Sequence, residues 1–540
     1  MNDTFDGIVI GSGQHGLVLA CYLQKQGLNV LLLERRMQYG GGLMTEDVTL
    51  PGFHHNLHSI NHWDLLNTPW YRDLNLADRV PYVTPKVEFS QPHRDGTALV
   101  FSRNLEKTVA SIARFSDRDA ATFRDWNRKA EIITKEIFVP ERFSEPLSKE
   151  ERDDLLGQTA TGRDFLSLTR QQPFELVTNM FESEQVQVFL LFKLSLFGTV
   201  LYDMIREESP TGSILRGFDI DTGYDLCQGG SWNLARGLME VFIANGGTFL
   251  NHADVTKVVV SQNRATGVEL ADGRSFSARQ FVSSTLNVHQ TFDGLVTKDQ
   301  LTPEFVAKVD RFHYTPWALF GLHLALEEAP RYTSTDYDPD VNNALKFNIG
   351  SETLQKLMSV HDVVKEGRVP GPDDIQFGAG AMTVIDPTQA PAGKHLAYAW
   401  QIVPYDKANP DLVESHRERI ADLMVDKWRD YAPNLTDGNI LGRYTYTPHD
   451  YAQALPNMAT GDIFMGAFTS DQVMYNHFGY RTPIEGLYMS GSAAHPGGAI
   501  SGGVGYITAK VICEDLDLTP WWHPVDAATS IRRFNKSHAD

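Results

Sequence analysis

The sequence has few of the residues that mark several common classes of protein. Its 540 residues include three cysteines, Cys21, Cys227 and Cys513, which lie far apart and match no CxxC motif. This scarcity argues against a disulfide framework, a zinc site and a thiol–disulfide relay. A reducing compartment fits, and the first apolar strand begins too early to leave room for a secretory signal. We therefore expect a cytoplasmic protein.

Positive charge is also scarce. The chain has 48 Lys and Arg residues against 68 Asp and Glu, which gives a net charge of −20 at pH 7. A nucleic-acid partner would need a basic footprint, and an anionic membrane surface would repel this excess of negative charge. The composition therefore predicts no nucleic-acid partner and does not favour a membrane contact.

No uninterrupted hydrophobic run is long enough to span a membrane. The most apolar stretch, residues 186–205, is interrupted by Lys193, Gly198 and Asp203. A spanning helix needs about 20 predominantly apolar residues. We interpret this Phe- and Leu-rich stretch as a buried helix that lines a substrate cavity. A monotopic membrane contact is the alternative interpretation.

A dinucleotide-binding fingerprint is present at the start of the chain. A buried strand leads into Gly11-Ser-Gly13-Gln-His-Gly16 and a helical run, and a second strand ends on Glu34, 23 residues after Gly11. The glycines let backbone N–H groups approach a pyrophosphate at the helix N-terminus, and the carboxylate can accept hydrogen bonds from the ribose hydroxyls. This unit predicts an adenine dinucleotide, either FAD or NAD.

Two later glycine clusters favour FAD. Residues 40–42 are glycines close behind the ribose acid, as expected if the backbone approaches an extended cofactor twice. A second cluster lies between a strand ending at Gly491 and a helix starting near Ser501 or Gly502. The N-terminus of that helix would stabilise a reduced flavin ring. No second complete GxGxxG unit exists, and Gly378-Ala-Gly380 is interpreted as a turn.

Four histidines lie within the nine positions from 54 to 62, after a Pro-Gly pair. The HxxxH spacing occurs twice, but no nearby carboxylate or cysteine completes a metal-ligand set. We therefore expect no metal site, and we place a polar loop near the reactive end of the cofactor. A covalent histidyl-flavin is a further hypothesis for this loop. Elsewhere, the residue pattern predicts an antiparallel meander over 255–284 and helices over 117–138, 165–180, 182–205 and 412–431.

The fingerprint, the Gly40–Gly41 follow-on and the run Gly486-Leu-Tyr-Met-Ser-Gly-Ser-Ala-Ala-His-Pro-Gly-Gly498 resemble one family. It is the phytoene desaturase (carotenoid desaturase-like) branch of the FAD-dependent amine oxidase superfamily, and the likeness is greatest to its pyridine nucleotide-disulphide oxidoreductase domain 2-like group. The resemblance implies an α/β fold with a discontinuous, doubly wound Rossmann-like FAD-binding domain and an inserted α+β substrate domain. The FAD-binding segments would be 1–84, 216–292 and 441–540, and the substrate segments 85–215 and 293–440.

The resemblance also implies which residues line FAD. They belong to the matching glycine motifs, with one backbone position that could face the adenine edge: Gly11, Ser12, Gly13, Gly16, Glu34, Arg35, Gly41, Gly42, Leu43, Val255, Gly491, Ser492, Ile500 and Ser501. Members of this family desaturate or saturate C–C bonds of apolar polyenes, and more distant relatives oxidise amines. The histidine-rich loop of this chain departs from the carotenoid enzymes.

The leading functional hypothesis is an FAD-dependent dehydrogenase or oxidase. It would transfer a hydride from a C–C, C–N or C–O bond of an apolar or amphipathic small molecule to flavin N5, with O₂ or a quinone as the electron acceptor. A carbon acid would also need a base, and neutral histidine is suited to that role near pH 7. The candidates are His495, His55 and His58.

Three alternatives stay open from the sequence. A flavin amine oxidase would need an aromatic cage, drawn from Trp63, Trp400, Tyr475 and Tyr506. A reductase that runs the flavin in the other direction would need an external electron donor. A non-catalytic protein that binds a partner or a lipid would use FAD as a structural element. Reduction of the flavin by a substrate would separate the catalytic hypotheses from the last one.

Overall fold

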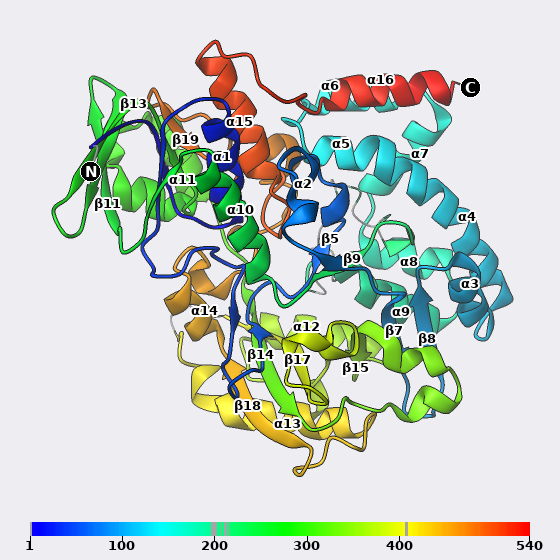
Figure 1. Ribbon diagram of the computed structural model, residues 1–540. Helices are drawn as coiled ribbons and strands as arrows, with labels where there is room; N and C mark the ends of the chain where they lie inside the picture. Colours follow the sequence, from blue (N-terminus) through cyan, green and yellow to red (C-terminus); the bar gives the residue numbers. More distant parts are fainter. Residues whose placement is uncertain are drawn as a thin grey trace.

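The computed structural model describes residues 3–195, 202–206, 208, 209, 212, 215, 217–405 and 409–539. Two seven-stranded sheets form its framework. In Figure 1 the first sheet lies at the upper left near the N-terminus, the second lies below, and a mostly helical layer occupies the right-hand side. The C-terminal helix α16 lies beside α6 in that layer, at the upper right.

The first sheet has the strand order β10-β2-β1-β13-β12-β11, with β19 beside β13. Strands β10, β2, β1, β13 and β19 run parallel to one another. The apolar runs of β1, β2 and β19 are largely buried, as is typical of a parallel sheet covered by helices. Their bounds are β1 (Thr4–Ile10), β2 (Val30–Leu33), β10 (Thr248–Leu250), β13 (Ser275–Ser284) and β19 (Leu487–Met489).

Three helices share a hydrophobic core with this sheet: α1 (Gln14–Lys25), α10 (Trp232–Ala244) and α15 (Gly503–Asp515). Since the strands are parallel, their carboxyl ends meet at one edge, where a doubly wound fold binds its ligand. Segments from both ends of the chain therefore meet at this edge. The doubly wound α/β architecture expected from the sequence is confirmed.

The antiparallel meander predicted over 255–284 is also confirmed. Strands β11 (Val255–Ser261) and β12 (Arg264–Leu270) pair with each other, and β12 pairs with β13. They extend the parallel sheet on the side opposite to β10.

The second sheet has the order β18-β14-β17-β16-β15-β7-β8 and is antiparallel except where β15 meets β7. Its strands are β7 (Val87–Pro92), β8 (Ala98–Ser102), β14 (Trp317–Leu326), β15 (Ala344–Ile349), β16 (Phe377–Gly380), β17 (His395–Pro404) and β18 (Ile440–Tyr446). The sheet thus joins segments about 200 residues apart in the chain. A domain boundary at residue 441 falls within β18.

The turn predicted at residues 378–380 is wrong, because these residues form part of β16 inside the second sheet. A side chain on Gly380 would approach the carbonyl oxygen of Leu345 to 2.6 Å. The glycines therefore serve close packing between strands β15 and β17 rather than chain reversal.

Two of the predicted helices are divided. Residues 165–180 belong to α7 (Ala160–Thr169) and α8 (Pro173–Met180), because Pro173 starts a new helix. Residues 117–138 form α4 (Asp117–Ile133) and a continuing π-helical turn. The helix predicted over 182–205 appears as α9 (Glu184–Ser195), and residues 196–201 lie outside the described part of the chain. The helix predicted over 412–431 is α13, which is shorter (Arg417–Arg429).

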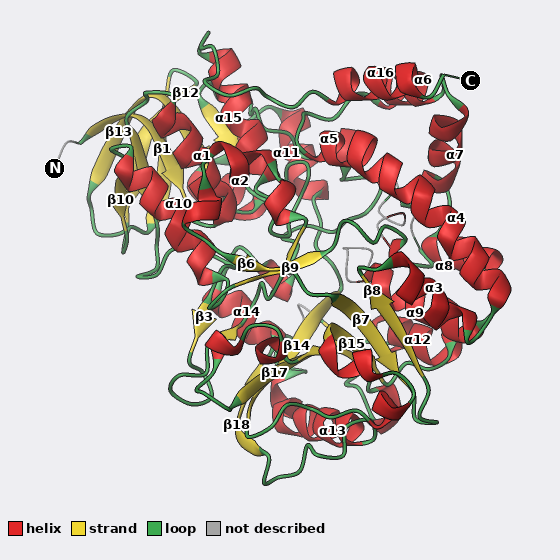
Figure 2. Ribbon diagram, turned by 45° about the vertical axis from the view of Figure 1, so that its right-hand side comes forward, coloured by secondary structure: helices red, strands yellow, loops and turns green. Residues whose placement is uncertain are grey.

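Short strands form two small separate sheets in addition to the two large ones. Figure 2 shows β6 and β9 between them. The small strands are β3 (Thr45–Glu46), β4 (His55–Asn56), β5 (His62–Trp63), β6 (Tyr82–Val83) and β9 (Tyr224–Cys227). The other α-helices are α2 (Pro69–Asp73), α3 (Leu105–Ala113), α5 (Val139–Arg142), α6 (Lys149–Leu156), α11 (Pro303–Arg311), α12 (Leu354–Lys365), α14 (Pro448–Ala454) and α16 (Ala527–Ser537). None of the described helices is both long and apolar enough to cross a membrane.

Candidate active site

A cavity of about 400 Å³ lies between the two sheets. Its lining includes Gly13 and Gly41 from the edge of the first sheet, and Ala379 and Trp400 from strands β16 and β17 of the second. The glycine-rich motifs and the second sheet therefore share one space. A dinucleotide bound at the glycine motifs would therefore lie next to a second molecule bound against the second sheet.

At one end of the cavity, the glycines of residues 11–16 and 40–42 expose backbone, and we term these two stretches the glycine cradle. A side chain on Gly16 would lie 2.1 Å from the carbonyl oxygen of Gly11, and one on Gly41 would lie 2.9 Å from the Cα atom of Gly13. The amide N–H of Gly40 donates to the carbonyl oxygen of Ser12 over 3.0 Å. The two loops thus lie so close together that only glycine fits, and they leave backbone for a ligand to contact.

Glu34 lies behind the glycine cradle at the end of β2. Its Oε2 atom accepts hydrogen bonds from the backbone N–H (3.1 Å) and the hydroxyl (2.7 Å) of Ser12, and its Oε1 atom accepts from the N–H of Arg36 (2.9 Å). Each carboxylate oxygen keeps lone pairs for further donors. The acid is therefore fixed in orientation and can still accept hydrogen bonds from a ribose.

The N-terminus of α15 closes the same end of the cavity. Its N-cap, Gly502, has a φ of +65°, and a side chain there would collide with the indole of Trp70. The indole N–H of Trp70 donates to the carbonyl oxygen of Ser501 over 2.6 Å and fixes the entry to the helix. A helix N-terminus at this place favours negative charge on a bound ring.

Six of the fourteen predicted cofactor residues line the cavity: Gly13, Gly16, Gly41, Gly42, Ser492 and Ile500. Arg35 is exposed, outside the lining. The remaining ones are held just behind the lining or in the adjacent cores: Gly11, Ser12, Glu34, Leu43, Val255, Gly491 and Ser501. The cradle, the fixed carboxylate and the helix N-terminus together suit FAD, whose assignment to these individual residues stays a prediction.

Two of the three predicted catalytic histidines line the cavity. His495 donates from Nε2 to the carbonyl oxygen of Glu141 over 2.7 Å, and burial lowers its pKa to about 4. Burial also lowers the pKa of His58 to about 3, and neither of its ring nitrogens has a hydrogen-bond partner. Both rings are therefore neutral at pH 7, and His58 keeps its nitrogens available to a bound molecule.

His55 is the third predicted candidate, and it does not line the cavity. Its Nε2 atom lies 2.8 Å from the hydroxyl of Thr49, and its ring contacts His323 edge-on at a centroid distance of 5.4 Å. His54 is exposed and pairs with Asp47. The histidine-rich segment thus contributes His58 to the cavity, and its other histidines point elsewhere. Among the residues that the structure describes, no cluster of three or more His, Cys, Asp and Glu side chains could hold a metal ion.

The proposed aromatic cage is only half assembled. Trp63 and Trp400 line the cavity. Tyr506 is buried against Tyr22, with the ring centroids 5.3 Å apart, and Tyr475 is also absent from the lining. The cavity is instead surrounded by aromatic and aliphatic side chains from many elements, which include Phe138, Trp317, Phe377 and Tyr398.

Two buried cations in the lining were not predicted from the sequence. The Arg142 guanidinium lies 4.7 Å from the ring centroid of Trp63, and burial lowers its pKa to about 10. The Lys346 ammonium lies 3.2 Å from the ring centroid of Tyr224. We refer to these four residues as the chamber wall. These residues come from α5, β15, β5 and β9. No local sequence pattern indicates that Arg142 and Lys346 are buried, because lysine and arginine side chains usually face solvent.

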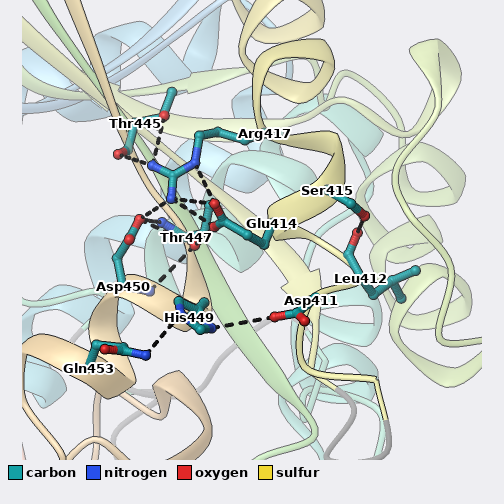
Figure 3. A network of polar contacts seen from close by, with 10 residues as sticks. All are labelled: Asp411, Leu412, Glu414, Ser415, Arg417, Thr445, Thr447, His449, Asp450 and Gln453. Atoms are coloured by element: carbon teal, nitrogen blue, oxygen red, sulfur yellow. Dashed lines mark hydrogen bonds and ion pairs between the residues drawn. The ribbon is translucent and has the colours of Figure 1, made fainter.

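Another polar network lies away from the cavity, where α13 meets β18 and α14. Figure 3 shows the guanidinium of Arg417 between the carboxylates of Glu414 and Asp450. Thr447 caps α14 through a capping box with Asp450. None of these residues lines the cavity, so the network stabilises the second sheet and takes no part in the site.

Comparison with known proteins places this arrangement in context. Residues 9–75 match the NAD(P)-binding Rossmann-like domain family. Over 547 aligned residues, the chain is 30% identical to one of the subunits of the limonene dehydrogenase of Castellaniella defragrans, with 98% of each chain covered. It is 26% identical to pyridine nucleotide-disulfide oxidoreductase domain-containing protein 2 of Rattus norvegicus, with 95% of this chain and 94% of that protein covered.

A solved structure supports the fold. Wild-type putrescine oxidase bound to putrescine superposes with a TM-score of 0.60 at 15% identity, covering 95% of this chain and 99% of the other. At this identity the likeness concerns the fold. The match over nearly the full length confirms the expected combination of a Rossmann-like domain with a second sheet-containing region.

Proposed function

Because this chain belongs to the phytoene desaturase-like branch of the FAD-dependent amine oxidase superfamily, we propose that it dehydrogenates an apolar or amphipathic small molecule. It is an FAD-dependent oxidoreductase of a group whose members act on C–C or C–N bonds. The substrate class is our proposal. One relative carries the name of a limonene dehydrogenase, which makes small apolar molecules the first candidates.

The observation that carries the proposal is the shared cavity. The glycine cradle and Ile500, just before the start of α15, meet the aromatic walls of the second sheet in one space of about 400 Å³. We propose that FAD contacts the glycine cradle, Glu34 and the helix N-terminus. Bound there, FAD supplies the electron-accepting chemistry, since N5 of its ring takes up a hydride.

The residues of this chain provide the surroundings for that chemistry. The apolar lining excludes water and orients the substrate by shape. His58 is neutral and has two unpartnered nitrogens, so it can hold the proton that leaves the substrate carbon. His495 offers less, because its Nε2–H is committed to the carbonyl oxygen of Glu141. We therefore propose His58 as the base.

Further parts of the proposal concern organisation and location. We propose that residues 1–84, 216–292 and 441–540 form the FAD-binding domain and that 85–215 and 293–440 form the substrate domain, except that the rest of β18, residues 441–446, belongs to the substrate domain. We also propose a cytoplasmic location, with which three buried, unbridged cysteines agree. O₂ or a quinone would reoxidise the cofactor.

The test begins with an absorption spectrum of the purified protein. We expect bound FAD with a band near 450 nm, and its complete absence would refute the central proposal. Anaerobic addition of limonene, phytoene, long-chain alcohols and amines follows in separate titrations. A substrate should bleach the band at a rate of about 1–1,000 per second. A protein that uses FAD as a structural element would not bleach with any of them.

Acid precipitation of the same sample tests how the cofactor is attached. If a histidine of the 54–62 segment carried the flavin covalently, the yellow colour would remain in the pellet. His58 is the histidine of that segment whose position at the cavity would allow such a bond. Colour that stays entirely in the supernatant excludes it.

A further inference from the structure

Arg142 is a buried cation in the lining of the cavity. Its side chain lines the cavity, and its guanidinium makes no ion pair or hydrogen bond with any described residue. Its contacts are the rings of Trp63 and Phe143. Asp64 acts on it electrostatically but lies beyond ion-pair distance.

Arg152 shows how this chain treats a buried guanidinium with a structural role. It is equally buried, and its Nε and Nη2 atoms donate to the two carboxylate oxygens of Glu141 over 2.5 and 3.1 Å. Removing a guanidinium from water is costly unless an anion replaces the lost hydration. Arg152 has such an anion within the protein. Arg142, next to Glu141 in the chain, makes no direct ion pair with a described residue, so we expect a ligand to supply one.

Lys346 adds a second positive charge to the chamber wall. Its ammonium lies over the ring of Tyr224, and the Tyr224 hydroxyl also interacts electrostatically with Arg142. Tyr224 thus lies close to both cations. Arg142 and Lys346 thus place two cations in the cavity lining of a protein whose net charge is −20.

Most of the other described titratable groups in the cavity lining are either neutral or paired. Burial lowers the pKa values of four lining histidines to about 3 or 4, so that they are neutral at pH 7: His15, His58, His477 and His495. Glu141 pairs with Arg152, Asp203 pairs with Arg206 over 3.6 Å, and Glu208 is exposed. Among the described lining residues, Arg142 and Lys346 are therefore the buried cations, and the buried carboxylate of Asp64 lies just outside the lining.

We propose that the cavity binds an amphipathic organic anion, whose carboxylate pairs with Arg142 near Lys346 while its apolar part lies against Trp317, Phe377 and Trp400. This inference rests on the proposed function and names the substrate class of the same site. A guanidinium binds a carboxylate through two parallel hydrogen bonds, which gives both affinity and orientation. The same charges would repel a protonated amine, so they oppose an amine oxidase activity.

A second source of negative charge exists, because Arg142 could instead serve the flavin ring. Its backbone lies near the start of α15, since a side chain on Gly503 would lie 2.9 Å from the carbonyl oxygen of Arg142. The experiment must therefore separate a bound organic anion from the cofactor. Probes that share one apolar chain and differ in the head group achieve this.

The FAD-loaded protein is titrated with decanoate, decanol and decylamine, and binding is followed by calorimetry and by thermal shift. The variants are Arg142→Met, Arg142→Lys and Lys346→Met, and the control is Arg114→Met, an exposed arginine that pairs with Asp338. We expect the wild type to bind decanoate about 10- to 100-fold more tightly than decanol, with decylamine weakest. Arg142→Met should reduce decanoate to the affinity of decanol, Lys346→Met should reduce it less, and Arg142→Lys and Arg114→Met should keep the preference.

Three outcomes would overturn the inference. The wild type could bind all three probes equally, Arg142→Met could weaken all three equally, or that variant could keep the decanoate preference while its FAD content or flavin spectrum changes. The last result would assign Arg142 to the cofactor. If Arg142→Met does not fold, Lys346→Met and Arg142→Lys decide the same question. Binding is measured without turnover, so a failure of the proposed dehydrogenation, seen as an unbleached flavin, is a separate result.

Discussion

The glycine cradle and the chamber wall bound the same cavity but are built in opposite ways. The cradle consists of two short stretches, 11–16 and 40–42, whose glycines bring the two backbones close together. The chamber wall consists of four side chains from four elements, and it works through charge and aromatic surface. The cofactor end of the site is thus specified locally, whereas the substrate end is specified by packing. Substitutions in the two regions should therefore have different effects.

The largest effect is expected in the glycine cradle. In Gly16→Ala, the new methyl group would lie 2.1 Å from the carbonyl oxygen of Gly11, which is backbone and cannot rotate away. We expect a loss of about 3–5 kcal/mol of unfolding free energy and no retained FAD. The matched control is Gly294→Ala, where no atom lies within 4 Å of the new methyl group. Urea unfolding and the ratio of FAD to protein measure both; equal effects of the two substitutions would contradict the prediction.

Around the cavity, the buried histidines make stability depend on pH. The pKa of His58 is about 3 in the folded protein, below its unfolded value of about 6.5. The unfolded state therefore binds the proton first, so stability is complete above pH 6.5 and falls as the pH decreases toward 3.

His58→Leu removes this contribution from the pH dependence. We expect the loss of stability between pH 6 and pH 4 to shrink by about 2–3 kcal/mol relative to the wild type. Thermal or urea unfolding across this range provides the measurement. The control is His523→Leu, at an exposed site, which should leave the pH dependence as it is. An unchanged slope in His58→Leu would mean that His58 has the same pKa in the folded and unfolded states, which would contradict the prediction.

The ribose acid should affect cofactor affinity more than stability. Glu34→Ala removes the carboxylate that Ser12 and Arg36 hold in place. We expect the dissociation constant for FAD to rise about 10- to 100-fold, since hydrogen bonds to a charged acceptor are among the stronger ones. Fluorescence titration of apoprotein with FAD measures it. Glu269→Ala, at a partly exposed ion pair with Lys257, should bind FAD as the wild type does.

The smallest effect is expected farthest from the cavity. Arg417→Met breaks the network with Glu414 and Asp450 in Figure 3, which is partly exposed and therefore screened by solvent. We expect a loss of about 1 kcal/mol of unfolding free energy. FAD affinity and probe binding should stay at wild-type values. A change in either would show that the network influences the site after all.

Prediction from the sequence succeeded where the pattern is local. The strand, the glycines and the helix between Phe5 and Glu34 follow one another in the chain, and so do the strands of the meander. It failed at Gly378–Gly380, because a glycine pair inside an apolar sheet resembles a turn when its neighbouring strands are unknown. It also could not rank His55 and His58, which are three residues apart and differ in which of them faces the cavity.

The sequence by itself determined the glycine turn after β1 and the position of Glu34. Gly11, Gly13, Gly16 and Glu34 are close in the chain, and their spacing alone imposes the turn and the close approach of backbone that we propose for the cofactor end, with Glu34 as the proposed acceptor for the ribose. Only the tertiary structure decided the substrate end. Arg142 and Lys346 are 204 positions apart in the chain. The protonation and the interactions of a charged side chain depend on its burial and on the groups around it, and no local sequence pattern records either.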